Sequence, residues 1–419
     1  MPEHRCAADE LANRLKEADA GDTIVLNGGT LTDCILTIDR RCDPDRPLTI
    51  RAADSGSVIL TGNSTLFLTG KHIVIEGLSF EACILDESCI VLDGATDCRI
   101  TDCRFSHSGG KRAALSIQGP AARNTVEYSE FAHLEQRSVQ VVIRSEEAPV
   151  DNRILENCFR DIPMIPSGNG RETIQIGQNQ RDWGHVEPKT VVERNRFLLC
   201  DGEIEIISNK SSRNVYRNNL FKDCKGELVM RGGSYCEITG NRHENCTGGI
   251  RLSGSHHSVT HNLIRNCSNG FRIPYGMMIE QGGLYQAVTE CLVAHNTVID
   301  SKKVGLNVGT NRLMDRKEMG VAKFAPYQNR FVNNLFASNT GRHCIVNEAP
   351  ENEVANNIFT GSADTAGLPG GNQTIKIDLG DGCRLPEGSQ ALDRVTRIEI
   401  ADYPNLGADL DKLTDAPIA

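Results

Sequence analysis

The sequence predicts an all-β protein, a single-domain right-handed parallel β-helix with an N-terminal capping helix. Three observations predict it. An asparagine followed two residues later by an apolar residue recurs along the 419-residue chain, in repeats of about 20 to 40 residues. The short strands between these units alternate apolar and polar residues, as in Glu203 to Ile206. The middle of the chain shows no helical periodicity.

The two ends of the predicted coil need covers, because a stack of strands exposes unpaired edges. Ala7 to Ala18 has a helical pattern, with Leu11, Leu15 and Ala18 on one face. We therefore expect residues 1–20 to form an N-terminal capping helix and residues 21–360 to form the β-helix. Residues 361–419 lose the repeat and become rich in Gly, Asp and Pro, so we expect a C-terminal capping segment there.

Equivalent positions of successive repeats carry the same kind of side chain. Aromatic positions recur at Phe80, Phe105, Phe131, Phe159, Phe197 and Phe221. Asparagine recurs at Asn195, Asn219, Asn241, Asn262, Asn296, Asn334 and Asn357. Side chains at the same turn of neighbouring coils lie about 4.8 Å apart, the spacing between strands, so we expect the amides to bond to one another and to the backbone.

The 16 cysteines follow the repeat as well. Four of them recur at intervals of 24, 22 and 21 residues, each three residues after Phe197, Phe221, His243 or Ile264: Cys200, Cys224, Cys246 and Cys267. No Cys-x-x-Cys pair occurs. Zinc knuckles and thioredoxin-like chemistry therefore have little support. We interpret these thiols as small buried apolar groups rather than as metal ligands or disulfide partners.

Composition excludes several classes of partner. The formal net charge is -10, which argues against nucleic-acid binding through a broad basic face. No stretch approaches 18 consecutive apolar residues, so no membrane span is expected. The N-terminal residues have no basic region followed by an apolar core, so no signal peptide is expected. Unpaired thiols likewise favour a reducing compartment. The location of the protein and its oligomeric state are left open.

One polar patch stands out on the predicted coil. Glu203 and Glu205 share one face of a strand, separated by an isoleucine. Lys210 ends that strand, and Arg231 and Arg251 fall in the next two repeats. Paired carboxylates repel unless cations neutralise them, and an all-oxygen set suits Ca²⁺ rather than zinc. The alternative is that the glutamates only pair with the basic residues on a solvated face.

With these residues in view, the sequence resembles polysaccharide lyase family 6, which contains alginate lyases and chondroitinase B and has the parallel β-helix fold. The resemblance covers most of the chain and is sharpest between Asn169 and Arg251. Its strongest motifs are NGRETIQIG at 169–177, DGEIEIISNKS at 201–211 and GELVMRGG at 226–233. Two positions depart from the family pattern: Gly232 stands where histidine is common, and Gln175 where arginine often stands.

The resemblance implies roles for individual residues. Asn169, Glu203 and Glu205 match the family's Ca²⁺ ligands. Lys210 matches its Brønsted base and Arg231 its Brønsted acid. Arg251 matches a contact to the substrate carboxylate.

Two further residues are candidate sugar contacts. Tyr285 lies in a long loop that could flank the cleft, and His256 precedes a second histidine. The alternative for each residue is an exposed surface position that binds no ligand.

The resulting hypothesis is a calcium-dependent lyase that cleaves an O4-linked uronic-acid polymer by β-elimination and leaves a 4,5-unsaturated uronate. Alginate is the first substrate, and dermatan sulfate, the polymer of chondroitinase B, is the second. Lys210 must be neutral to accept the C5 proton, and nearby positive charge favours that form. Hydrolysis by paired aspartates is unsupported, because no Asp-Asp pair occurs. A noncatalytic β-helix that binds polysaccharide is the remaining alternative.

Overall fold

The computed structural model describes residues 2–165, 169–278, 285–315, 320–337, 339–349, 351–361 and 372–374. The chain divides into two compact units. The first comprises the described parts of Met1–Gln178 and Pro188–Ile204, and the second those of Asn179–Glu187 and Glu205–Pro404. Each unit is a parallel β-helix, in which three parallel sheets, named A, B and C, receive one strand in turn from each coil.

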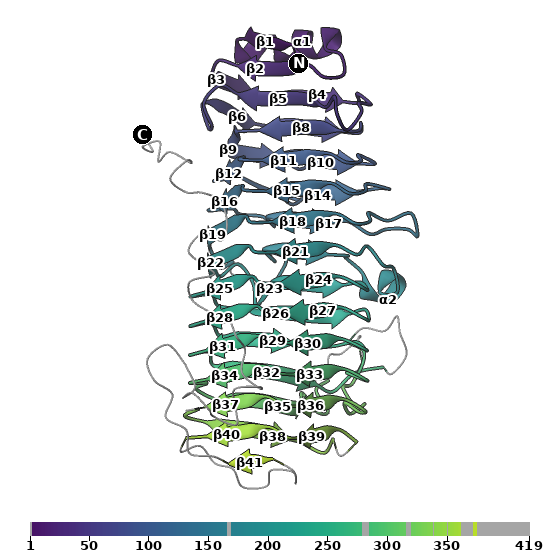
Figure 1. Cartoon of the computed structure of the whole chain (residues 1–419), viewed down its shortest axis with the longest axis vertical. Helices are drawn as coiled ribbons and strands as arrows, with labels where there is room; N and C mark the ends of the chain where they lie inside the picture. The colour runs from purple at the N-terminus through teal and green to yellow at the C-terminus, as the bar shows by residue number, and fades with distance from the viewer. Residues whose placement is uncertain are drawn as a thin grey trace. The chain divides into compact units, whose positions relative to one another are not determined.

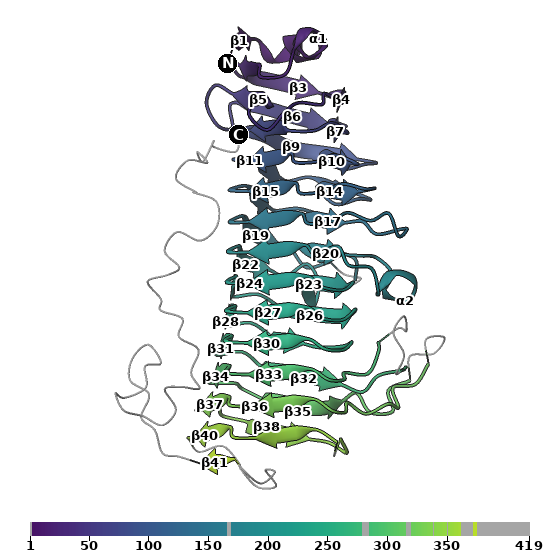
Figure 2. The same ribbon diagram turned by 45° about the vertical axis from the view of Figure 1, so that its right-hand side comes forward.

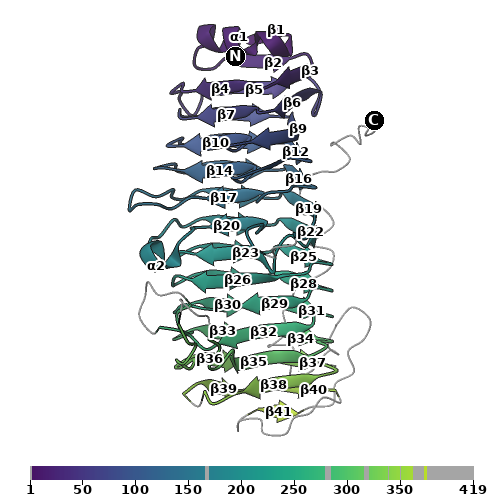
Figure 3. The same cartoon turned by 180° about the vertical axis from the view of Figure 1, so that it is seen from behind.

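The strands of the first unit stack in sequence order, as Figures 1 and 3 show for sheets A and C. Sheet A contains β1 (Glu3–Cys6), β2 (Thr23–Leu26), β5 (Leu48–Ala52), β8 (Ile73–Glu76), β11 (Arg99–Thr101), β15 (Thr125–Glu127), β18 (Arg153–Leu155) and β21 (Val191–Glu193). Sheet B contains β3 (Gly29–Thr32), β6 (Val58–Gly62), β9 (Leu78–Leu85), β12 (Arg104–Ser106), β16 (Glu130–Ala132), β19 (Cys158–Ile162) and β22 (Arg196–Cys200), and β13 (Gly109–Gly110) pairs with β9. Sheet C contains β4 (Ile35–Ile38), β7 (Thr65–Leu68), β10 (Ile90–Asp93), β14 (Leu115–Gln118), β17 (Val139–Val141) and β20 (Ile174–Ile176).

The second unit repeats this arrangement (Figure 2). Sheet A contains β24 (Val215–Arg217), β27 (Glu237–Thr239), β30 (Ser258–Thr260), β33 (Leu292–Ala294), β36 (Arg330–Val332) and β39 (Glu353–Ala355). Sheet B contains β25 (Leu220–Lys222), β28 (Arg242–Glu244), β31 (Leu263–Arg265), β34 (Thr297–Ile299), β37 (Leu335–Ala337), β40 (Ile358–Thr360) and β41 (Gln373–Thr374). Sheet C contains β23 (Glu205–Lys210), β26 (Glu227–Gly232), β29 (Gly248–Arg251), β32 (Asn269–Pro274), β35 (Val304–Thr310) and β38 (Arg342–Val346).

The core consists of columns of like side chains, because parallel register places each repeat position above its equivalent in the next coil. In the first unit, Ile24, Ile50 and Ile75 are successive partners in sheet A, and all are fully or almost fully buried. In sheet B the rings of Phe105 and Phe131 stack with their centroids 4.6 Å apart. The predicted parallel β-helix is therefore confirmed.

Asparagine forms the predicted ladders. In the second unit, Asn241 Nδ2 donates to Asn262 Oδ1 at 3.0 Å, and the backbone N–H of Asn241 donates to the same oxygen at 2.9 Å. Asn262, Asn296 and Asn334 continue the pattern. These amides satisfy backbone groups at a buried turn, where an unpaired group would be costly.

The N-terminal helix is present, after a 3-10 turn at Ala8–Glu10. Helix α1 spans Leu11–Glu17, and Ala8, Leu11 and Ala18 are buried. One strand that the sequence did not predict, β1, precedes the turn and pairs with β2.

The division into residues 1–20, 21–360 and 361–419 stays a prediction. Of the C-terminal segment, only residue 361 and residues 372–374 lie in the described part of the chain.

The described cysteines are free thiols. All of them are buried, as the repeat predicts, except for the half-buried Cys34. Among the described residues no helix is long and apolar enough to cross a membrane.

Candidate active site

Two β-bulges shape the polar strands of sheet C in the second unit. Pairing between β23 and β26 runs from Glu205 with Glu227 to Lys210 with Gly232, and the register shifts once near each end. Ile206 is the extra residue at the first shift, and Arg231 is the extra residue at the second. A bulge re-aims a side chain and twists the strand locally. Arg231 therefore projects from an irregular position directly beside the end of β23.

Glu205 is the centre of an ion-pair cluster in the second unit. Its carboxylate pairs with the Arg251 guanidinium and accepts a hydrogen bond from Ser208 Oγ at 2.6 Å, and Arg231 Nη1 lies 3.6 Å from Glu205 Oε2. Glu205 is only 4% exposed. Burial alone would raise the pKa of Glu205, but the charges of the two arginines, with Ser208 and Lys210, outweigh it and hold that pKa below the usual value.

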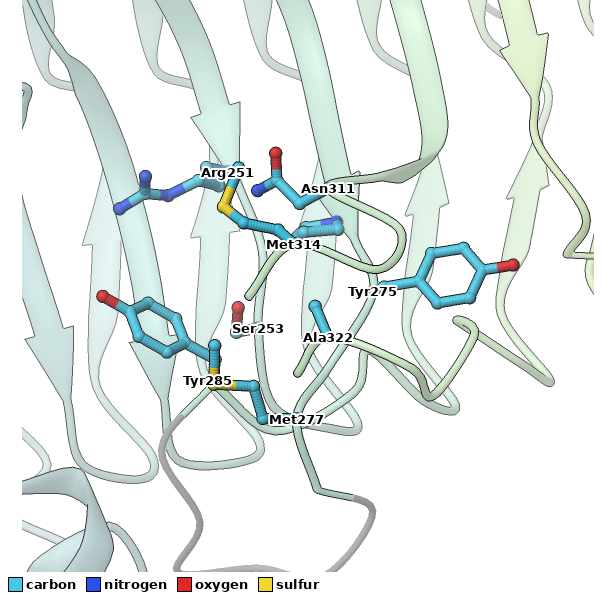
Figure 4. A pocket seen from close by; sticks show the side chains of 9 residues that line it. Arg251, Ser253, Tyr275, Met277, Tyr285, Asn311, Met314 and Ala322 are labelled. Carbon is cyan, nitrogen blue, oxygen red and sulfur yellow. The ribbon is translucent and has the colours of Figure 1, made fainter. Parts of the chain in front are cut away.

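Arg231 connects this cluster to a pocket. Its Nη2 donates to the hydroxyl of Tyr285 at 2.8 Å, and its guanidinium carbon lies 5.1 Å from the centre of that ring. Figure 4 shows Tyr285 and Arg251 on the same side of the pocket. The pocket is lined by Arg251, Ser253, Pro274, Tyr275, Met277, Tyr285, Asn311, Met314 and Ala322.

A second acid–base pair extends the cluster along sheet C. Glu227, the register partner of Glu205, is 3% exposed and accepts from Arg272 Nη2 at 2.5 Å. Arg272 is itself the register partner of Arg251. Arg251 and Arg272 therefore follow one another along one face of the coil, and each pairs with a buried glutamate. These pairs keep the two guanidinium groups aligned on that face, although the net charge of the chain is negative.

The first unit contributes a separate group of acidic residues. Glu172 and Glu203 are both buried, and their carboxylate oxygens lie within 4.8 Å of one another. Glu203 Oε2 accepts the backbone N–H groups of Gly170 and Arg171 at 2.6 and 3.1 Å, which fixes the loop that begins at Asn169. Glu205 follows Glu203 by two residues, so the chain itself keeps a third carboxylate close by.

Glu172 is held from its other side. Arg137 Nε donates to one of its oxygens at 2.7 Å and Gln175 Nε2 to the other at 2.6 Å. Two buried carboxylates so close together favour a bound cation, and the donor set contains only oxygen. The residues therefore fit a hard cation such as Ca²⁺ better than a thiophilic metal.

The predicted site residues fall into three places. Glu205, Lys210, Arg231, Arg251 and Tyr285 lie together in the second unit, with Lys210 5% exposed at the end of β23. Asn169 and Glu203 lie in the first unit, where Asn169 is exposed. His256 lies elsewhere: its ring stacks on Tyr235 at 4.5 Å, and its Nε2 is 3.1 Å from Glu290. Among the described residues His256 therefore contacts Tyr235 and Glu290 rather than the arginine cluster, and its predicted role as a sugar contact stays a prediction.

Sequence reasoning missed Glu172 and Ser208. Glu172 could have been found from the sequence, because it is an acidic residue inside the motif 169–177 and lies two residues before the strand Ile174–Ile176.

Equal spacing after the aligned cysteines Cys200 and Cys224 would pair Glu205 with Val229. Glu205 instead pairs with Glu227, because the chain is two residues longer between Cys200 and Glu205 than between Cys224 and Glu227, whereas Val229 pairs with Arg251, as equal spacing after Cys224 and Cys246 predicts.

The two departures from the family motif are both buried and packed. Gln175 bonds to Glu172 and to Gln140, its partner in the β17–β20 ladder. A Cβ at Gly232 would lie 2.8 Å from the Cβ of Gln180, the first residue of helix α2 (Gln180–Trp183). Gln180 thus occupies the space that a side chain at position 232 would need.

The fold is the parallel β-helix of the family 6 polysaccharide lyases. The family model described as chondroitinase B matches residues 6–380, so the chain belongs to the chondroitinase B family. None of the curated proteins matches the chain.

Solved structures agree on the fold. The PL6 family alginate lyase AlyGC has a TM-score of 0.84 and 22% identity over 97% of this chain and 58% of its own. This chain therefore spans less than two thirds of AlyGC. A lyase of family 6 from human gut microbiota, described as specific for mannuronic acid, has a TM-score of 0.79 and 25% identity over 90% of this chain and 92% of its own. A PL6 alginate lyase described as a complex with a trisaccharide has a TM-score of 0.74 and 17% identity over 98% of this chain and 95% of its own.

Proposed function

We propose that this protein is a calcium-dependent polysaccharide lyase that cleaves an O4-linked uronic-acid polymer, most favourably alginate, by β-elimination. The observation that supports it best is the cluster of Lys210, Arg231 and Arg251 around the buried Glu205. Such a cluster offers a base, a proton donor and a carboxylate contact along one face of the coil. The solved relatives named as alginate lyases favour alginate among the uronans.

The reaction needs the loss of a poorly acidic proton. The C5 proton of a uronate lies beside a carboxylate whose negative charge opposes its removal. Ca²⁺, when bound, would neutralise that carboxylate and stabilise the enolate-like charge. Asn169, Glu203 and Glu205 would hold the cation, and we add Glu172 to this set because it is buried beside Glu203.

The residues of the second unit carry the proton steps. Lys210 accepts the C5 proton, and the electron pair left on C5 forms the C4–C5 double bond as the C4–O4 bond breaks. Arg231 stabilises the negative charge of the leaving O4 and supplies its proton, either directly or by steering a water molecule that donates it. Tyr285 orients Arg231 through its hydroxyl. Arg251 contacts the substrate carboxylate.

The test measures ultraviolet absorbance of the unsaturated product with alginate, dermatan sulfate and pectate as substrates. We expect a rise with alginate, and a loss of about 10²- to 10⁴-fold in kcat for Lys210→Ala with polymer binding retained, because a general base contributes that much. Lys222→Ala, an exposed lysine on β25, is the matched control and should keep full turnover.

Other outcomes select the alternatives. A rise only with dermatan sulfate would favour the chondroitinase B-like activity. Binding of polymer by wild type and by Lys210→Ala with no product from either would instead favour a noncatalytic polysaccharide-binding protein and overturn the lyase.

A further inference from the structure

Asn311 is a polar residue of the pocket beside Arg251 that the reaction above does not use. It directly follows β35, which ends at Thr310, and it is only half-buried. Figure 4 shows its side chain extending from its loop toward Arg251. Among the described residues no hydrogen bond holds its side-chain amide. A molecule that enters the pocket can therefore reach this amide.

The loop that carries Asn311 is held in place by backbone hydrogen bonds. Met314 N donates to the Asn311 carbonyl at 3.0 Å and closes a turn. Leu313 N donates to the Ala322 carbonyl at 2.8 Å, and Ala322 N donates to the Met314 carbonyl at 3.0 Å. These bonds fix the loop before a ligand arrives, so the Asn311 side chain is presented to the pocket at a small cost in conformational entropy.

The rest of the pocket suits a sugar ring. Tyr285 adds an aromatic ring, and Arg251 is the only charged residue among the described residues of the lining. The apolar part of the lining consists of Pro274, Met277, Met314 and Ala322. A mainly apolar pocket with a few placed polar groups is typical of sites for small ligands. The C–H face of a pyranose ring can pack on such a lining, while the polar side chains reach the hydroxyls at the edge of the ring.

The backbone of Asn311 is in the left-handed region, with a φ of 62°. Asparagine tolerates this conformation better than most residues, so the alternative is that Asn311 serves only the turn. Glycine adopts the same φ readily. Replacement by glycine therefore removes the amide and keeps the turn, which separates the two roles.

We infer that Asn311 is a substrate-contacting residue whose side-chain amide hydrogen-bonds a ring hydroxyl of the uronate unit bound by Arg251. This inference rests on the proposed lyase function and deepens it, because it assigns a specificity-determining contact to the loop after β35. An O4-linked uronate keeps hydroxyls at C2 and C3, each of which both donates and accepts. The amide of asparagine also does both, through its NH₂ group and its carbonyl oxygen, whereas a guanidinium group only donates.

The test compares the steady-state turnover of alginate by wild type and by Asn311→Gly. We expect KM to rise roughly three- to tenfold, the effect of one neutral hydrogen bond, with kcat and Tm close to wild type. Asn311→Asp should raise KM further, because its carboxylate would compete with the substrate for Arg251. An unchanged KM for Asn311→Gly would show that the asparagine serves the turn alone and would overturn the inference.

The matched control is Asn333→Gly. Asn333 is also half-buried and left-handed, with a φ of 57°, in the turn between β36 and β37. It does not line the pocket. Its replacement should leave KM and kcat unchanged. An equal rise of KM in both variants would show a general effect of glycine in these turns and reject the contact.

Failure of the proposed function gives a different result. If wild type releases no product from any uronan, the lyase proposal falls, and the Asn311 contact is then judged by calorimetric binding of a purified alginate tetrasaccharide. Weaker binding by Asn311→Gly than by wild type and Asn333→Gly would support the contact without turnover. Equal affinity of the three proteins, or no binding by wild type, would reject it.

Discussion

His243 is a titratable residue at a position of the repeat that otherwise holds large apolar side chains. It pairs in register with Phe221 and Ile264, its ring stacks on Phe221 at 4.4 Å, and neither ring nitrogen has a partner among the described residues. Burial lowers the pKa of His243 to about 4. The folded protein therefore keeps this ring neutral at pH values where the unfolded chain protonates it.

His243→Phe should raise stability, and more so in acid. Below the ordinary histidine pKa of about 6.5 the unfolded wild-type chain binds a proton that the folded protein refuses until about pH 4, so wild type loses stability across that window. A shift of this size corresponds to about 3 kcal/mol, and removing the unpaired ring adds about 1 kcal/mol at neutral pH. Urea unfolding from neutral pH to about pH 4 measures the gap.

Ile264→Val, at the register partner of His243, provides the control, because it weakens the packing without removing a titratable group, and its loss of stability should be the same at every pH. Parallel loss of stability by wild type and His243→Phe across the window would contradict the assignment of a buried neutral histidine.

Helix α1 acts at the scale of an element, because it packs over the first coil of the first unit. Leu11→Asp replaces a side chain that is 2% exposed with a carboxylate. Loss of the buried leucine alone costs about 2–5 kcal/mol. Each coil contacts mainly its neighbours, so we expect local opening. Hydrogen exchange should quicken in β1 and β2 and stay unchanged in β24 and β27.

Ala12→Asp is the matched control, since Ala12 is exposed on the same helix. It should leave exchange unchanged. If Leu11→Asp quickened exchange equally in every strand, the helix would not be a local cap.

For the whole molecule, the proposed cation links the site to stability. A ligand that binds only the folded protein raises its stability by about 2.7 kcal/mol at a hundredfold excess over Kd. We expect Ca²⁺ to raise Tm in calorimetry and a chelator to reverse the rise. Glu203→Gln should abolish it, whereas Glu237→Gln, at an exposed position on β27, should keep it. An equal rise in wild type and Glu203→Gln would remove Glu203 from the ligand set.

The sequence by itself determined the coil and indicated most residues of the candidate site. Periodicity is a local property, and in a parallel stack each repeat position meets its own equivalent, so the Asn and Phe ladders could be predicted without a structure. The motifs also selected Glu205, Lys210 and Arg231, and a long loop selected Tyr285, all of which lie together in the second unit.

Only the tertiary structure decided which side chains face one another where the repeat is broken. Two more residues separate Cys200 from Glu205 than Cys224 from Glu227, and the bulge at Ile206 then shifts the register by one residue until the bulge at Arg231 restores it. Ladder spacing therefore could not predict that Glu205 pairs with Glu227. Nor could it place Gln180 over Gly232, because that contact joins a segment between coils to a strand, and segments between coils follow no period.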